Sequence, residues 1–303
     1  SSWVNRYQEM QVFAAVAQTG SLAAAARHLN LAPATITRTL SALEARLGTV
    51  LLLRSPRGAS LSTAGERFAA SCRLILEEIA EAEHSAAGIH RHPAGPLTVS
   101  LPLLLTHQVF MPIALDYLNA FPDVQLRTRT RESLPKLLEE GIDVAFVVGH
   151  LPDSSGFAVL VGHVAPIICA APGYLSRWGR PDTPDALKDH RSVLATSMGD
   201  GADWRLHGNP SSRAARTAPV LICTTQQAAI RAAVAGLGLV RCMSYEAHEE
   251  LHSGLLEPVL EAFAAPELPA QLIYREGRKA CTRVRTFLDF AVPRLRSHPA
   301  FRP

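Results

Sequence analysis

The sequence lacks several features that would each indicate a different class of protein. No run of about 18 apolar residues appears, so no membrane span is expected. The first residues, Ser1-Ser2-Trp3-Val4-Asn5-Arg6, do not have the pattern of a signal peptide. The five cysteines are scattered and form no Cys-x-x-Cys pair, which argues against a disulfide framework or a zinc site. Together these absences favour a protein that is located in the reducing cytoplasm.

Motifs for nucleotide binding and hydrolysis are also missing. There is no phosphate-binding loop and no Gly-x-Ser-x-Gly nucleophile turn. Gly236 and Gly238 lack the third glycine of a dinucleotide-binding motif. His90 and His92 lie close together, but no further ligand stands near them, so no metal is expected. We therefore expect neither an enzyme nor a bound cofactor.

Residues 1–65 contain no lysine and no aspartate. Their charged residues are six arginines against two glutamates, Glu9 and Glu44, which gives a net charge of +4. The whole chain carries only +3, so its basic character is concentrated at the N-terminal end. A compact basic module can neutralise phosphates and gain from counterion release. An ordinary helical domain with surface arginines would have the same composition, so charge alone does not decide between the two.

Two helix patterns separated by a short turn lie in this basic segment. Gly20 can end one helix, and Ser21 can cap the next by accepting a backbone N–H. Pro33 fits the first turn of a helix over residues 33–47, where its missing N–H costs nothing. Apolar residues recur at helical spacing in both segments. The arrangement predicts a helix-turn-helix, whose second helix enters the DNA major groove.

The predicted DNA contacts lie at the start of the second helix and in the segment after it. Alanine and the methyl group of threonine can contact thymine methyl groups, and arginine can reach guanine or phosphate. Two short strands, 51–53 and 60–62, are expected to flank a turn with arginines, as in a wing against the DNA backbone or minor groove. The candidate DNA-binding residues are Ser21, Ala32, Pro33, Ala34, Thr35, Thr37, Arg38, Arg54 and Arg57.

A long helix is predicted from about Ala64 to Gly88. Thr63 can cap it, and Glu66 stands three residues later, as in a capping box. A helix of this length needs a partner to bury its apolar stripe, which is either a second copy of the helix or the domain that precedes it. The residues with the spacing of a seam are Phe68, Cys72, Ile75, Ile79, Ala82 and Ala86. Residues 90–96 then break the helix and are predicted to form a hinge.

These N-terminal motifs resemble those of the LysR-type transcriptional regulators. Leu52 departs from the family pattern, which has phenylalanine there, and this change is expected to affect only packing in the wing. The matching residues are Phe13, Val16, Ala17, Gly20, Ser21, Leu22, Ala25, Ala26 and Leu29, then Pro33, Ala34, Thr37, Leu40, Leu43, Glu44, Leu47 and Gly48, then Leu51, Arg54, Leu61, Ser62, Ala64 and Gly65.

Beyond residue 96 the chain alternates apolar strands with helical segments. The continuous apolar strand 143–148 is typical of a parallel sheet that is buried on both faces. Repeated units of this kind predict parallel sheets with right-handed crossovers. Strands are predicted at 97–101, 124–130, 143–148, 164–170, 192–196, 218–223, 236–240 and 271–274, and helices at 112–121, 133–140, 226–235 and 282–295.

This region is similar to the LysR-type effector domain, in which two α/β lobes form an architecture like that of periplasmic binding proteins. Matching segments include Phe121-Pro122-Asp123-Val124 and Ala171-Pro172-Gly173-Tyr174-Leu175. The resemblance implies an α/β fold class: an N-terminal winged helix-turn-helix, a long linker helix and a two-lobed effector domain. The implied boundaries are 1–65 for the DNA-binding domain, 66–92 for the linker and hinge, and 93–303 for the effector domain, with lobe I at 93–165 and 268–303 and lobe II at 166–267.

A ligand site is expected where the C-terminal ends of the strands meet helix N-termini, whose free N–H groups and partial positive charge favour an anion. Arg131 is the candidate partner of a carboxylate, although it could equally form a surface ion pair with Glu132 or Glu139. Thr224 or Thr225 could equally cap a helix. The candidate effector-binding residues are Ser100, Leu101, Pro102, Leu103, Arg131, Thr196, Ser197, Thr224 and Thr225.

The resemblance thus implies a cytoplasmic transcription regulator that binds double-stranded promoter DNA as a homo-oligomer, a dimer or a tetramer. It also implies a small-molecule effector, a carboxylate by the argument above, and no membrane contact. A solute-binding protein shares the C-terminal architecture, but the helix-turn-helix disfavours it. A repressor without an effector, which would use the lobes only for assembly, stays open. The sequence names neither ligand nor operator, nor whether transcription is activated or repressed.

Overall fold

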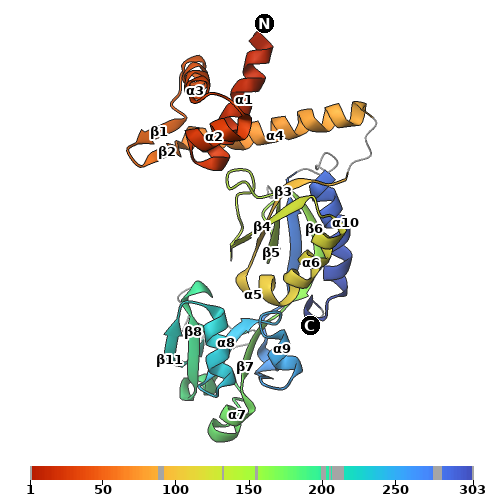
Figure 1. The fold of residues 1–303 in the computed structure, drawn as a ribbon. Helices are drawn as coiled ribbons and strands as arrows, with labels where there is room; N and C mark the ends of the chain where they lie inside the picture. Colours follow the sequence, from red (N-terminus) through yellow and green to blue (C-terminus); the bar gives the residue numbers. More distant parts are fainter. Residues whose placement is uncertain are drawn as a thin grey trace.

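The computed structural model describes residues 2–87, 92–131, 133–153, 156–198, 203–204, 206, 215–275 and 282–301. A helical N-terminal domain leads into one long helix, and two lobes with a central sheet each follow (Figure 1). None of the helices in these residues has the length and apolar character that a bilayer crossing requires.

Three helices form the N-terminal domain: α1 (Ser2–Thr19), α2 (Leu22–Leu29) and α3 (Pro33–Leu47). The hydroxyl of Ser21 caps α2 by accepting a hydrogen bond from the backbone N–H of Ala24 at 3.3 Å. Helix α3 has the predicted bounds and begins with a proline, whose ring fixes a helical backbone angle. The domain core contains the fully buried residues Val12, Phe13, Ala25, Ile36, Leu40 and Leu43.

A two-stranded wing and a long helix complete this part. Strands β1 (Leu52–Ser55) and β2 (Gly58–Leu61) are antiparallel, and Leu52 packs inward as part of the domain core. Helix α4 (Thr63–Ala86) follows. The predicted cap at Thr63 is wrong, because Thr63 is already helical and the hydroxyl of Ser62 accepts from the N–H of Gly65 at 3.0 Å.

The sheet of lobe I has the order β4-β3-β5-β14-β6. Strand β14 runs antiparallel to both its neighbours, so the expectation of purely parallel sheets is wrong. The reason is that the chain enters lobe I a second time from the other lobe and therefore crosses the sheet in the opposite direction. The strands are β3 (Gly95–Leu101), β4 (Val124–Thr130), β5 (Val144–Val148), β6 (Phe157–Val164) and β14 (Leu268–Tyr274).

Helices α6 (Met111–Ala120) and α10 (Thr282–Ser297) cover this sheet (Figure 1). The ring centroids of Tyr117 on α6 and Phe287 on α10 lie 5.4 Å apart in the lobe I core. A short α5 (Leu103–Leu105) and a π-helical turn (Thr106–Phe110) precede α6, and neither was predicted.

The sheet of lobe II has the order β11-β8-β12-β7-β13, and β7 is antiparallel to both its neighbours. Its strands are β7 (Pro166–Ala170), β8 (Arg191–Ala195), β11 (Ala218–Cys223), β12 (Leu239–Met243) and β13 (Glu257–Val259), with a separate pair β9 (Asp203–Trp204) and β10 (Ala215–Arg216). Its α-helices are α7 (Pro172–Trp178), α8 (Gln226–Val234) and α9 (His248–His252). The short 3-10 turns are Pro184–Asp189, Thr196–Met198 and Glu261–Phe263, with a fourth, Pro299–Phe301, at the end of lobe I.

Two predicted elements differ in the structure. The single strand expected at 164–170 is two strands in different lobes, because β6 ends at Val164 and β7 begins at Pro166. The helix expected at 133–140 is a series of bends and turns. Pro135 has no N–H to donate, and the N–H of Lys136 donates instead to the carboxylate of Glu140 at 2.7 Å.

Among the described residues, each lobe contributes one buried side chain to the core of the other. Leu104, three residues after β3 of lobe I, is 4% exposed and belongs to the hydrophobic cluster of lobe II. Tyr245, two residues after β12 of lobe II, is 3% exposed and belongs to the cluster of lobe I. The side-chain amide of Gln108 also donates to the carbonyl oxygen of Glu246 at 3.3 Å.

Candidate nucleic-acid interface and effector site

Helix α3 presents small and polar residues to solvent at its N-terminal end. Its apolar residues Ile36, Leu40 and Leu43 are fully buried on the other face. Thr35 is partly buried, so it has less room for a contact than the other candidates. The exposed candidates on or just before α3 are Ala32, Pro33, Ala34, Thr37 and Arg38. The geometry therefore leaves the predicted recognition face of α3 accessible.

Both glutamates of residues 1–65 make internal contacts. Glu9 has a side chain that is only 4% exposed, and its Oε2 lies 2.6 Å from Nη2 and 3.0 Å from Nε of Arg46. The Oε1 atom of Glu44 accepts hydrogen bonds from the backbone N–H groups of Leu51 at 2.8 Å and Leu52 at 3.0 Å. Glu9 thus ties α1 to α3, and Glu44 fixes the start of the wing.

The arginines predicted to contact DNA are exposed. Among the residues that the structure describes, the guanidinium groups of Arg38, Arg54 and Arg57 have no hydrogen bond or ion pair. Gly58, with φ 125°, closes the wing turn, and the backbone N–H of Arg57 donates to the hydroxyl of Ser55 at 3.3 Å. Because the nearby carboxylates are already engaged, this surface has positive charge that is available to phosphate.

The predicted seam on α4 divides into two parts. Phe68 and Cys72 pack in the core of the N-terminal domain, and the ring of Phe68 lies 5.3 Å from that of Phe13. Burial raises the pKa of the Cys72 thiol to about 12, so this thiol stays protonated at neutral pH. Ile75 is 42% exposed, Ile79 is partly buried, and Ala82 and Ala86 are exposed. The alternative of packing on the same domain therefore applies to the first two residues only.

The structure brings the effector candidates of each lobe together at strand ends. Ser100 and Leu101 are each 1% exposed at the end of β3, and Pro102 precedes α5, which contains Leu103. Thr196 and Ser197 are exposed and follow β8 directly. The N–H of Ser197 donates to the carbonyl oxygen of Thr224 at 3.1 Å, which joins the ends of β8 and β11. These two groups come from different lobes, as the predicted site requires.

Two candidates make structural contacts in this conformation. Thr225 caps α8, since its Oγ1 accepts from the N–H of Ala228 at 3.3 Å. Arg131 forms an ion pair in which its Nη1 lies 2.7 Å from Oε1 of Glu140. This partner is neither Glu139, which pairs with Lys136, nor Glu132, which lies outside the described residues. The Nε atom of Arg131 is buried without a hydrogen-bond partner.

Two open grooves lie away from these residues. A groove of about 320 Å³ is lined by Val159, Tyr274 and side chains of α10, and a second of about 290 Å³ by residues that include Leu134 and Arg275. In the described part of the chain, no group of three or more His, Cys, Asp or Glu side chains could hold a metal ion. His90 lies outside that part.

Sequence reasoning did not single out a polar cluster between α4 and lobe I. Asp143 stands directly before the buried strand β5, and Arg73 and Glu77 lie one helical turn apart on α4. A carboxylate at the start of a buried strand was the signal that could have drawn attention to it. The residues of the cluster lie far apart in the sequence, 70 residues for Arg73 with Asp143 and 206 residues for Glu77 with Arg283, so local spacing gives no information about their contacts.

Comparison with known proteins covers both parts of the chain. Residues 7–66 match the bacterial regulatory helix-turn-helix proteins of the lysR family. Residues 90–296, more than half of the chain, match the LysR substrate binding domain. The chain belongs to the LysR family. It is a LysR-type transcriptional regulator with a helix-turn-helix domain and an effector-binding domain.

Relatives of this LysR-type regulator match it over nearly its full length. An HTH-type transcriptional regulator of Xanthomonas campestris pv. campestris (strain 8004) is 30% identical, over 94% of this chain and 84% of its own. The transcriptional activator AaeR of Escherichia coli (strain K12) is 28% identical, over 94% and 93%. The structure of CrgA, a LysR-type regulator from Neisseria meningitidis, is similar with a TM-score of 0.61 at 26% identity, over 95% of this chain and 98% of CrgA.

Proposed function

We propose that this LysR-type regulator binds double-stranded promoter DNA in the cytoplasm as a homo-oligomer, and that a small carboxylate bound between the lobes controls the binding. One observation carries the DNA part. In the described part of the chain, Arg38 on α3 and Arg54 and Arg57 on the wing have no carboxylate partner, because Glu9 pairs with Arg46 and Glu44 bonds the backbone at the start of the wing. Such a surface favours a polyanion over water and salt ions.

The two parts of this surface have different roles. The N-terminal end of α3, with Ala34, Thr37 and Arg38, enters the major groove, where methyl groups read thymine and the guanidinium reads guanine. Arg54 and Arg57 on the wing contact the sugar–phosphate backbone or the minor groove, which positions the protein without reading sequence. Domain boundaries at 1–65, 66–92 and 93–303 fit this division of roles.

Oligomer formation follows from the exposed apolar residues of α4. Ile75, Ile79, Ala82 and Ala86 continue the stripe beyond the domain core, and burying them against a second α4 gives a dimer. Two dimers joined through their effector domains give a tetramer, a step that rests on similarity to the family. A dimer places two copies of α3 on two half-sites, which increases affinity because the second contact becomes intramolecular.

The carboxylate lies between the strand ends of the two lobes. The start of α5 faces it from lobe I, and Thr196, Ser197 and Thr224 face it from lobe II. A carboxylate that reaches Arg131 has to displace Glu140, which now occupies that guanidinium. Ligand binding is then an exchange of one carboxylate for another, and the released Glu140 changes the contacts of the segment before β5.

The experiment screens organic acids by calorimetry against the full-length protein and repeats the measurement on variants. Arg131→Ala and Thr196→Val are each expected to weaken binding of the best acid at least about tenfold, that is by about 1.4 kcal/mol. Affinity for operator DNA without ligand should stay unchanged, because the two sites lie on separate domains. Arg127→Ala is the matched control, since Arg127 is an exposed arginine on β4, the strand that ends just before Arg131, and its guanidinium bonds Gln125 in the described part of the chain.

Three outcomes would contradict parts of the proposal. Acid binding that survives both variants would place the ligand elsewhere. Failure of every acid to bind would support a regulator that uses the lobes only for assembly. Absence of salt-dependent binding to duplex DNA would remove the regulatory role and favour a solute-binding protein.

A further inference from the structure

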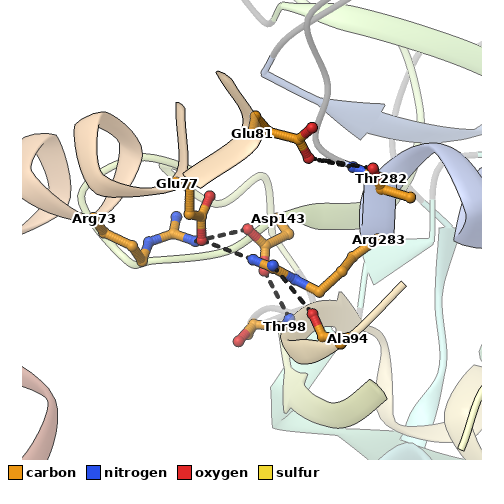
Figure 2. Close-up of polar contacts among 8 residues, drawn as sticks. All are labelled: Arg73, Glu77, Glu81, Ala94, Thr98, Asp143, Thr282 and Arg283. Atoms are coloured by element: carbon orange, nitrogen blue, oxygen red, sulfur yellow. Dashed lines mark hydrogen bonds and ion pairs between the residues drawn. The ribbon is translucent and has the colours of Figure 1, made fainter. Parts of the chain in front are cut away.

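Helix α4 has a second functional face on the side opposite its apolar stripe. Residues three or four apart share a helix face, so Arg73, Glu77 and Glu81 project together while Ile75 and Ile79 project to the other side. All three of the first set contact lobe I of the same chain (Figure 2). We call Arg73, Glu77 and Glu81 the charged face of α4.

The first contact joins α4 to the central strands of lobe I. The Nη1 atom of Arg73 lies 2.8 Å from Oδ1 of Asp143, whose side chain is only 9% exposed. The other oxygen of Asp143 accepts a hydrogen bond from the N–H of Thr98 at 2.8 Å, and the N–H of Asp143 donates to the carbonyl oxygen of Thr98 at 2.9 Å. Asp143 is therefore held rigidly by β3, and it fixes the guanidinium of Arg73.

The second contact joins α4 to α10 and to the start of β3. The Oε1 atom of Glu77 accepts a hydrogen bond from Nη2 of Arg283 at 2.7 Å and lies 3.6 Å from Nη1 of Arg73. The Nη1 atom of Arg283 also donates to the carbonyl oxygen of Ala94, at 3.2 Å. Arg283 thus bridges the linker helix and the segment that enters lobe I.

The third contact lies at the first residue of α10. The Oε1 atom of Glu81 accepts hydrogen bonds from the backbone N–H of Thr282 at 3.3 Å and from its hydroxyl at 3.2 Å. A carboxylate at this position satisfies an unpaired donor of the helix and interacts favourably with its dipole. Three successive turns of α4 are therefore bonded to one side of lobe I.

We propose that the charged face of α4 is a docking surface for lobe I of the same chain, and that it sets the orientation of the DNA-binding domain relative to the effector domain. The apolar stripe lies on the opposite side of α4, so a dimer can form while lobe I stays docked. The occupant is the chain itself: Asp143 and Arg283 supply one charge of each sign, complementary to Arg73 and Glu77.

The position of the docking surface links it to the predicted effector site. Thr98 and Ser100 belong to the same strand, β3, and Asp143 directly precedes β5. The charged face of α4 contacts the N-terminal ends of these strands, while the candidate effector residues lie at the C-terminal end of β3. This link rests on the proposed function, whereas the docking itself does not.

The docked contact is suited to orientation rather than to strong attachment. Burial raises the pKa of Glu77, and this desolvation outweighs the opposing effect of Arg73 and Arg283. The pair of Glu77 and Arg283 is partly buried, with side chains 23% and 16% exposed, and such a pair contributes little net stability because desolvation offsets the attraction.

The test exchanges the charges of one pair and measures the shape of the full-length protein by small-angle X-ray scattering, without DNA or ligand. Glu77→Arg and Arg283→Glu should each increase the maximum dimension, and the double variant should restore the wild-type profile. The matched control is Glu78→Arg with Arg285→Glu, because these are exposed neighbours of the same residue types. The controls should keep the wild-type profile singly and together.

Further measurements keep the proposal falsifiable. Thermal unfolding confirms that each variant is folded, and sedimentation should show the same oligomeric state as the wild type. Folded single variants with a wild-type profile would overturn the docking, as would a double variant that stays extended. A wild-type profile from the two single variants co-expressed as a mixed dimer would place the contact between subunits and overturn the same-chain assignment. Failure of DNA or acid binding would affect none of these results.

Discussion

Gly65 of α4 lies directly against Leu51 of the wing. A Cβ atom at Gly65 would stand 2.1 Å from the carbonyl oxygen of Leu51 and 3.0 Å from its carbonyl carbon. The same oxygen accepts a hydrogen bond from the N–H of Ser62 at 2.9 Å, so it cannot turn away without losing that bond. Glycine is the residue that lets the first turn of α4 approach the wing this closely.

Replacing this glycine should therefore destabilise the N-terminal domain. We expect Gly65→Ala to lower the free energy of unfolding by about 1–3 kcal/mol, the usual cost of overpacking, as measured by urea denaturation. Gly173→Ala is the control, because no atom lies within 4 Å of a Cβ at Gly173. Equal stability of the two variants would contradict this expectation and would show that the backbone at Leu51 can shift at little cost in free energy.

Arg38 should contribute directly to operator binding. We expect Arg38→Ala to weaken the affinity by about 1–3 kcal/mol at fixed salt if the guanidinium reads a base. Arg57→Ala should reduce the slope of log affinity against log salt by about 1, as for the loss of a phosphate contact. Arg177→Ala changes an exposed arginine on α7 and should have no effect. Unchanged operator affinity of a folded Arg38→Ala protein would remove Arg38 from the interface.

The apolar stripe of α4 should be required for dimer formation. Ile75→Asp with Ile79→Asp would bury unpaired charge at a helix–helix seam, which is strongly unfavourable. We expect this variant to lose its dimer and its DNA affinity together, as followed by sedimentation and by binding assays. Ile75→Leu with Ile79→Leu keeps the apolar surface and should behave as wild type. An unaltered oligomer in the aspartate variant would rule out the seam.

A buried histidine should make stability depend on pH. The hydroxyl oxygen of Tyr174 accepts a hydrogen bond from the backbone N–H of Arg191 at 3.1 Å and lies 2.7 Å from Nδ1 of His190. This arrangement fits a neutral imidazole whose Nδ1 accepts a hydrogen bond from the Tyr174 hydroxyl. Burial lowers the pKa of His190 below 6.5, against the smaller opposing effect of Asp189. The unfolded chain then binds the proton more readily than the folded one.

The sign of the effect follows from that difference. The contribution of His190 is fully present above its unfolded pKa of 6.5 and is lost as the pH falls from there through the lowered pKa. We expect urea denaturation to give a smaller free energy of unfolding at about pH 5.5 than at about pH 7.5. His190→Gln should reduce this difference, and His298, whose pKa is also lowered by burial, accounts for part of the remainder. If the difference in the free energy of unfolding between the two pH values were the same in His190→Gln as in the wild type, other groups would be responsible for the pH dependence.

Local signals in the sequence predicted several elements well. Helix α3 has the predicted bounds because Pro33 and Gly48 define its two ends. Strand β11 also begins and ends at the predicted residues, because its apolar run is bounded by a threonine on each side. Other signals were ambiguous. Ser62 and Thr63 are adjacent residues that can both cap a helix, and contacts outside the helix hold Ser62 in the capping position: its N–H donates to Leu51 and its hydroxyl to the carbonyl oxygen of Val50.

The errors arise where distant contacts decide the structure. The apolar pattern of β14 does not reveal its direction, which depends on how the chain returns from lobe II. Arg131 and Glu140 are nine residues apart, and their pairing depends on the turn that replaces the expected helix. The contact of Arg73 with Asp143 spans 70 residues and has no local signal.

The exchange of Leu104 and Tyr245 between the lobes restricts how the effector domain can respond. Opening the lobes widely would withdraw both side chains from a core, at a cost of about 1.5–3 kcal/mol each. We therefore expect crystal structures with and without the effector to differ by a small rotation, and a wide opening would contradict this. Helix α4 has 24 residues and is therefore about 36 Å long. From Glu81, the docked residue farthest from the DNA-binding domain, to Thr63 the helix extends about 27 Å, so a rotation of about 5° about Glu81 moves the DNA-binding domain by about 2 Å. In the proposed dimer, this helix would then act as a lever that converts a slight adjustment between the lobes into a change in the spacing of the two recognition helices on DNA.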